Sequence, residues 1–309
     1  MDAGSHSLSA QIRHGGPWRT VRLLLLWSEP VRGYLQFSPT LIVLSVTMAL
    51  PFGLMLLYSV WTQSYLDVNT TATLANYQAI GDKPLFSALF ARSLWISGST
   101  TIWAVVLAYP LAYYVAFHVR KNKIFWLILL TLPFLTSYLL RIFAWKVILG
   151  YEGVINSSLG FLGLISEPIP WLMYSPMAVT ITLVHAWLPF AVMPIFVSLE
   201  KIDRTCLEAA NDLGLSNKAS FFRVTLPLSI PGIVAASLMI FIPTVGEYVT
   251  PVLVGGPDGL MIANYIQVMF GRANNWPLGA ATAIVMMGLI TLCSVGFLLL
   301  MYTIRRGAR

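Results

Sequence analysis

Six long apolar runs divide the chain, and each is long enough to cross a membrane as a helix. The segments between them hold most of the charged residues. A helix needs roughly 20 mostly apolar residues to span the hydrocarbon layer of a bilayer. We therefore predict an all-α membrane protein with six transmembrane helices. The runs cover residues 38–61, 93–117, 124–149, 177–198, 231–254 and 278–303.

Composition supports this prediction, because only 10% of the residues are charged and the mean hydropathy is +0.76. Soluble domains carry about 25% charged residues. The first run is too long for a cleaved signal and lacks a small-residue cleavage site, so we expect it to remain as an anchor. The short apolar stretch "VRLLLLW" at 21–27 is expected to lie along the membrane interface.

Lys and Arg residues set the predicted orientation, because cytoplasmic loops carry an excess of them. Most of the 19 lie in the N-terminal segment, the turn at 119–123, the connection at 199–230 and the C-terminal tail. Both termini are therefore placed in the cytoplasm. The predicted organisation is a cytoplasmic or interfacial segment 1–35, a membrane domain 36–304 and a tail 305–309. Since the basic residues are dispersed between spans, they indicate topology and no nucleic-acid partner.

The chain contains no recognisable catalytic or metal-binding constellation. Cys206 lies in a loop and Cys293 in a span, so they cannot pair, and the four His residues are scattered. No Lys follows a Gly, which excludes the end of a phosphate-binding P-loop. We therefore predict that the chain is not an enzyme and holds no metal and no cofactor.

The second apolar run carries a stripe of small residues at four-residue spacing: Ala104, Ala108, Ala112 and Ala116. Small residues let helices approach closely in lipid, where no hydrophobic force drives them together. The stripe is expected to pack either inside the subunit or against a second subunit.

The connection at 199–230 interrupts the apolar pattern with two predicted short helices. Asp203 is a typical N-cap for the first, and Gly214 follows its last apolar position, where a left-handed residue ends many helices. Ser216 can cap the second helix, which Pro227 and Pro231 are expected to end.

In the first of these helices Cys206, Ala210 and Leu213 are spaced to share one apolar face. An exposed apolar face with a charged rim usually marks a protein partner. The alternative is a solvated linker.

The sequence "EAANDLG", followed after nine residues by "VTLP", resembles the EAA loop of permease subunits in binding-protein-dependent ABC importers. The resemblance implies that this loop is a coupling helix that docks on an ATPase partner, which binds ATP and Mg. The matching positions are Glu208, Ala209, Ala210, Gly214, Leu226 and Pro227, with Val224 in place of the usual Ile.

Other stretches are similar to spermidine/putrescine-type permeases, among them "YPLAYYVA" at 109–116 and "IPTVGEYVTPVLVGGPD" at 242–258. The resemblance implies the type I importer permease fold in a bacterial inner membrane. It also implies a second homologous permease, an ATPase dimer and a periplasmic solute-binding protein. Closure of the ATPases on ATP would then switch the permeases between inward-facing and outward-facing states.

Glu247 lies seven residues before the predicted outer end of the fifth span. A charge in lipid costs on the order of 2.5–3.5 kcal/mol or more, so such a residue should face a cavity or a partner. We hypothesise that Glu247 and Tyr248 line the translocation path and that Glu247 holds or steers a cationic group. The alternative is an ion pair with Arg141 or Lys146.

Arg141 and Lys146 are expected to extend outward from the third span to the membrane surface. Arg141 and Trp145 match the R-x-x-A-W stretch of the family, and the resemblance implies a structural or gating part for Arg141 beside the path. Tyr138, Trp145 and Tyr248 could stack on an ammonium group, or act as interface anchors.

Two positions weaken the expectation of a polyamine. The resemblance leads us to expect an acidic residue at 252 or 275, and Val252 and Asn275 occupy them. A singly charged or zwitterionic amino-acid derivative, a betaine or an opine is therefore an alternative solute. A stand-alone secondary transporter or channel is a further alternative, although no inverted repeat supports it.

Overall fold

The computed structural model describes residues 29–65 and 67–307 and consists of two units, Met1–Leu57 and Tyr58–Arg309. The predicted interfacial stretch 21–27, and most of the N-terminal segment 1–35, fall outside the described residues. The first unit contributes α3 (Glu29–Ser59), which runs on into the second unit by two residues. Its apolar side chains are largely exposed along the described length. A helix that is apolar all round requires lipid or another protein as its surroundings.

The second unit is helical apart from one short antiparallel hairpin, β1 (Thr62–Ser64) and β2 (Asp67–Asn69), in which Thr62 lies opposite Asn69. Its helices and helical turns are α4 (Ala75–Asp82), α5 (Pro84–Phe117), α6 (Lys123–Thr131), η1 (Leu132–Leu135), α7 (Tyr138–Leu149), α8 (Val154–Phe161), η2 (Pro170–Leu172), α9 (Pro176–Glu200), α10 (Arg204–Asp212), α11 (Asn217–Ser220), η3 (Phe221–Thr225), α12 (Leu226–Val245), η4 (Pro251–Gly255), α13 (Gly256–Gly259), α14 (Ile262–Phe270) and α15 (Trp276–Gly307).

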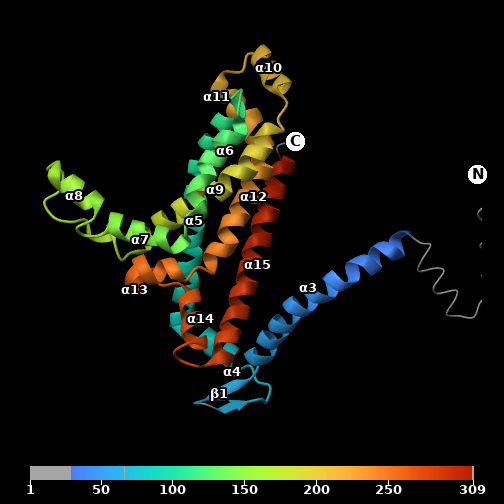
Figure 1. Ribbon diagram of the computed structural model, residues 1–309, viewed down its shortest axis with the longest axis vertical. Coiled ribbons are helices and arrows are strands. Elements are labelled where there is room, and N and C mark those ends of the chain that lie inside the picture. The colour runs from blue at the N-terminus through green and yellow to red at the C-terminus, as the bar shows by residue number, and fades with distance from the viewer. Residues whose placement is uncertain (1–28, 66, 308–309) are drawn as a thin grey trace, which may run out of the picture. The chain divides into compact units, whose positions relative to one another are not determined.

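The core of this unit is the contact of α5, α9 and α12 (Figure 1). The alanine stripe of α5 is buried in it, beside Val192 and Ile195 of α9 and Ile240 of α12. A Cβ atom at Gly232 of α12 would lie 2.5 Å from Cβ of Ser198 on α9, so the two helices meet there without room for a side chain. Of the two predicted uses of the alanine stripe, the structure shows packing inside the subunit.

The two ends of the second unit carry different segments. Helices α10 and α11 lie at the same end as the C-terminus of α15, whereas the hairpin and α4 lie at the opposite end (Figure 1). This arrangement agrees with the prediction that the 199–230 connection and the C-terminus share one side of the membrane.

Five helical stretches among the described residues are long and apolar enough to span a membrane, and a bent pair makes the sixth. The third predicted span is that pair, because Lys123–Leu135 and Tyr138–Phe161 meet at 82°. A single helix over 124–149 was therefore wrong. Pro133 lies in the η1 turn, where its ring and missing N–H interrupt the helical hydrogen bonds.

Other boundaries also differ from the prediction. The second span begins at Pro84 rather than near 93, and the fifth ends at Val245 rather than near 254. The segment between the third and fourth predicted spans contains α8.

Pro227 and Pro231 do not end the second helix of the 199–230 connection, contrary to the prediction. The helical stretch runs without a gap from Asn217 to Val245. The π-helical turn η3 precedes Pro227, and the Leu226 N–H bonds to the Phe221 carbonyl five residues back. The regular hydrogen-bond pattern is thus already interrupted where Pro227 lacks its N–H, so the proline is accommodated.

Candidate functional site

The connection between α9 and α12 folds through local capping contacts. The Asp203 carboxylate accepts a hydrogen bond of 3.0 Å from the Thr205 N–H, which also lowers the pKa of that carboxyl. At the start of α11, the Ser216 hydroxyl accepts one of 3.4 Å from the Ala219 N–H. Both predicted N-caps are confirmed.

Gly214 ends α10 with a φ of +82°, as predicted. Its N–H bonds to the Asn211 carbonyl at 2.8 Å, and the Leu215 N–H bonds to the Ala210 carbonyl at 3.1 Å. These two bonds form a Schellman motif, which requires a left-handed residue between them. Glycine adopts that conformation without steric strain.

Cys206, Ala210 and Leu213, which the spacing predicted to share one apolar face, differ in burial. Ala210 is buried, whereas Leu213 is 84% exposed and Cys206 is exposed. The burial of Ala210 agrees with the packing of α10 against α11 and η3 within the same connection. The Leu213 side chain, like Phe222 on η3 at 64% exposed, lies free on the surface of the described structure. Of the residues that carry the EAA resemblance, Glu208, Ala209 and Gly214 are exposed, and Leu226 and Pro227 are half-buried at the start of α12.

A second group of polar side chains gathers where α12 ends. The Tyr138 hydroxyl on α7 donates a hydrogen bond of 2.7 Å to Oε2 of Glu247 and lies 2.8 Å from Oγ1 of Thr250. The other oxygen of Glu247 accepts from the N–H groups of Val249 and Thr250, at 2.9 and 3.2 Å. Glu247 thus caps the helical turns that follow it and links them to α7.

This placement corrects the predicted position of Glu247, which lies past the end of α12 and not seven residues inside a span. Gly246 and the two residues after it, which belong to no helix, form the break. Within the described residues, the ion pairs are Arg92–Asp258 and Lys123–Glu200. The proposed pairing of Glu247 with Arg141 or Lys146 is therefore not observed.

Arg141 is buried, at 7% exposed, and does not extend outward as predicted. Its guanidinium donates to the carbonyls of Phe134 and Thr136 at 3.0 and 3.1 Å, and to that of Ala186 at 3.4 Å. The bend between η1 and α7 leaves backbone carbonyls without helical partners. Such groups must be satisfied inside the membrane, and Arg141 satisfies them.

Within the described residues, neither Tyr248 nor Trp145 is hydrogen-bonded to the Glu247 carboxylate. Tyr248 is 46% exposed beside the break. The Trp145 ring packs edge-on against His185 of α9, with ring centroids 5.3 Å apart. His185 and Thr250 were missed in the sequence. His185 had a usable signal, since ionisable residues inside spans are rare and often functional. Thr250 had none.

A bundle of membrane-spanning helices with a capped two-helix loop between its fourth and fifth spans is the arrangement that the EAA resemblance implies for the permease subunit of an ABC importer. No family model matches the chain. The chain is 41% identical over 228 residues to the spermidine/putrescine transport system permease protein PotB of Salmonella typhimurium (strain LT2), which covers 73% of this chain and 79% of that protein. PotB of Escherichia coli (strain K12) is equally similar and is covered to 82%. The inner membrane ABC transporter permease protein YdcU of Escherichia coli is 34% identical over 74% of the chain and 75% of its own length.

The chain therefore belongs to the family of ABC transporter permeases that includes PotB. It is the non-catalytic, multi-pass component of an inner-membrane importer, and permeases of this family bind no cofactor themselves. This membership decides against a stand-alone secondary transporter or channel.

The fold agrees with that of solved transporters. A bacterial ABC transporter that imports the acidic polysaccharide alginate matches with a TM-score of 0.70, at 16% identity, over 91% of this chain and 98% of its own. The same transporter in complex with an alginate-bound periplasmic protein matches with a TM-score of 0.71, at 16% identity, over 88% of this chain and 95% of its own. At this identity the likeness shows a shared fold.

Proposed function

We propose that this permease forms half of the pathway by which a small cationic solute of the polyamine type crosses the inner membrane. The observation that carries the proposal is the 41% identity to permeases named for spermidine and putrescine transport. The Glu247 carboxylate, fixed at a break in the spans, supplies a negative charge where such a solute would pass.

The pathway residues have distinct roles in this proposal. Glu247 attracts the amine, and the exposed face of Tyr248 and the ring of Trp145 offer aromatic surfaces to it. Tyr138 holds the carboxylate in place through its hydroxyl. Arg141, whose guanidinium is occupied by carbonyls, maintains the bend beside the path.

The proposed partners are a second homologous permease, two ATPase subunits and a periplasmic binding protein. The exposed side chains of the 199–230 loop, among them Leu213 at 84% and Phe222 at 64% exposed, supply the surface on which an ATPase would dock. Closure of the ATPases would move the two loops together and open the path toward the periplasm.

The test is uptake of labelled putrescine and spermidine by the complete transporter in liposomes. Glu247→Gln removes the charge and keeps the shape, and we expect the apparent KM to rise about tenfold, the factor that about 1.4 kcal/mol of lost charge interaction gives. Tyr138→Phe retains the ring and should have a smaller effect. The control is Glu152→Gln, which removes an exposed outer carboxylate away from the break. Unchanged uptake and affinity in Glu247→Gln would remove this residue from the pathway.

A second solute class is favoured by two side chains. Val252 is 58% exposed beside the break, and Asn275 is half-buried directly before α15; these are the positions where polyamine permeases are expected to carry an acid. One carboxylate matches one positive charge, as in a betaine, an opine or another amino-acid derivative. Solute binding to the cognate periplasmic protein separates the two classes.

A further inference from the structure

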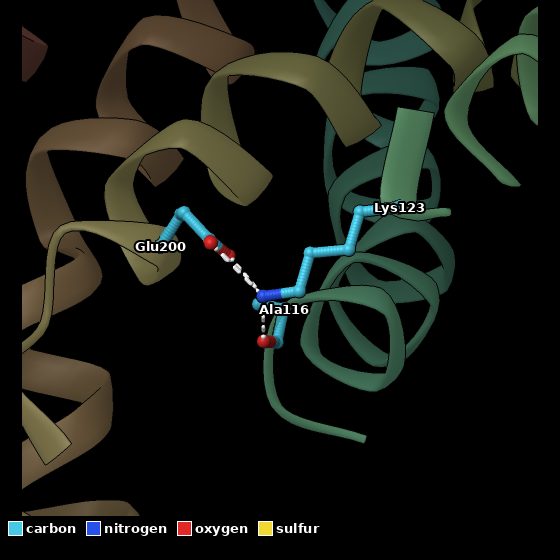
Figure 2. Close-up of polar contacts among 3 residues, drawn as sticks. All are labelled: Ala116, Lys123 and Glu200. Carbon is cyan, nitrogen blue, oxygen red and sulfur yellow. Dashed lines mark hydrogen bonds and ion pairs between the residues drawn. The ribbon is translucent and has the colours of Figure 1, made fainter. Parts of the chain in front are cut away.

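Three helix ends meet at the base of the coupling loop (199–230), and one side chain joins them. The Lys123 ammonium, at the start of α6, lies 2.8 Å from the carbonyl oxygen of Ala116 in the last turn of α5. It also lies 2.9 and 2.8 Å from the two carboxylate oxygens of Glu200, the last residue of α9. Figure 2 shows the ammonium between these two acceptors.

The charges are placed against the preference of their own helices. A helix N-terminus carries partial positive charge and its C-terminus partial negative charge. Lys123 begins α6 and Glu200 ends α9, so each side chain is unfavourable for the helix that carries it. Local helix stability therefore does not explain the two residues, whereas their mutual contact does.

The contact also satisfies a backbone group that α5 leaves open. The His118 and Val119 N–H groups both bond to the Tyr114 carbonyl, and the Lys123 ammonium provides a donor for Ala116. Asn122 adopts a left-handed φ of +59° that turns the chain directly into Lys123. The ammonium thus lies close to the C-terminal ends of both α5 and α9, where a cation is favourable.

The position of Glu200 links its contact with Lys123 to any movement of the coupling loop. The coupling loop begins here, and Asp203, the cap of α10, follows three residues later. Between them Ile202 is buried against the core. The Ala116 end of α5 belongs to the same core. Any displacement of the loop relative to α5 and α6 must therefore strain or break the contact of Lys123 with Glu200.

We propose that Lys123 and Glu200 are positioning residues that transmit force from the coupling loop to α5 and α6, so that these helices move together with α9. The inference rests on the proposed docking of an ATPase on this loop. It assigns a role to two residues outside the EAA sequence itself.

The test uses the complete transporter in liposomes, with ATP hydrolysis and solute uptake measured on the same samples. The variants are Lys123→Glu, Glu200→Lys and the double exchange. Each single variant places like charges opposite each other, and we expect solute taken up per ATP hydrolysed to fall about three- to fivefold, the range of a partly exposed ion pair. The double exchange restores the ion pair, although not the hydrogen bond to the Ala116 carbonyl, and should return the ratio to within about twofold of wild type.

Lys121→Glu is the matched control, because Lys121 lies exposed in the same turn and its replacement changes the charge equally. Thermal unfolding of each variant provides the second readout. A purely structural role would lower uptake and hydrolysis in proportion and leave their ratio unchanged. That outcome, or a double exchange that fails to restore the ratio, would overturn the inference. Failure of the proposed function is distinguishable, since the wild-type transporter would then show no ATP-dependent uptake.

Discussion

Gly214 allows the sharpest test of the coupling loop, because only its backbone conformation is constrained. Its φ is +82°, and a Cβ atom added there would have no neighbouring atom within 4 Å. Substitution therefore introduces no clash with the rest of the chain. The penalty is the left-handed conformation itself, roughly 1–2 kcal/mol for an L residue. Asn tolerates this region better than Ala, and a β-branched Val tolerates it least.

A penalty of 1–2 kcal/mol changes a population by a factor of about 5–30. The penalty lowers the population of the capped loop, which is the form that would dock on the ATPase. For Gly214→Val, the affinity of the permease pair for the ATPase should therefore fall by about the same factor. The expected order of affinity is Gly, Asn, Ala, Val. The assay is titration of the ATPase onto the purified permease pair in nanodiscs, followed by uptake per ATP in liposomes.

The chain provides a matched control in Gly163, which has a φ of +68° and also has open space around its Cβ position. It follows α8 in the outer loop, so Gly163→Val imposes a similar backbone penalty away from the coupling loop. Normal affinity and transport in Gly214→Val would refute the need for a left-handed turn. Equal losses for Asn and Val would show that side-chain volume at the docking surface matters, and not φ.

Three further substitutions test the structure. Asp203→Ala should increase amide exchange in the first turn of α10, because it removes the cap. The pKa of Asp203 is lowered, so the wild-type cap persists at neutral pH and is lost only as the pH falls through that lowered value. Amide exchange measured at several pH values would show this loss. Gly232→Ala should lower the unfolding temperature, because its Cβ would lie 2.5 Å from that of Ser198 and overpacking costs about 1–3 kcal/mol. Gly288→Ala is the control: its Cβ would meet open space, so the unfolding temperature should not change. Arg141→Ala should destabilise the permease by on the order of 2–5 kcal/mol, because it removes the donor from the partly buried carbonyls of Phe134 and Thr136, and an unchanged thermal melt would contradict this.

The coupling loop was predictable from sequence because its structure depends on local contacts. Asp203, Gly214 and Ser216 each act within three or four residues along the chain, and all three adopt the predicted caps or turn. The apolar runs were equally clear, since membrane insertion depends on composition over a single segment. These signals need no knowledge of the tertiary fold.

The residues that sequence analysis misplaced depend on contacts between distant segments. Arg141 was expected at the membrane surface, because nothing local reveals that the bend at 136–137 creates carbonyls for it to bind. The hydrogen bond from Tyr138 to Glu247 joins positions 109 residues apart. Pro227 was expected to end a helix, because the π-helical turn that accommodates it has no simple sequence signal.

The continuous helix from Asn217 to Val245 gives the molecule a long lever arm. It contains 29 residues, which corresponds to about 43 Å at 1.5 Å per residue. One end of the arm lies in the second half of the coupling loop and the other lies two residues before Glu247. A tilt of about 5° at the loop would sweep the far end sideways by roughly 4 Å, about the width of an alkyl chain. A modest rotation delivered from the cytoplasm is thus geometrically sufficient to open or close the neighbourhood of that carboxylate.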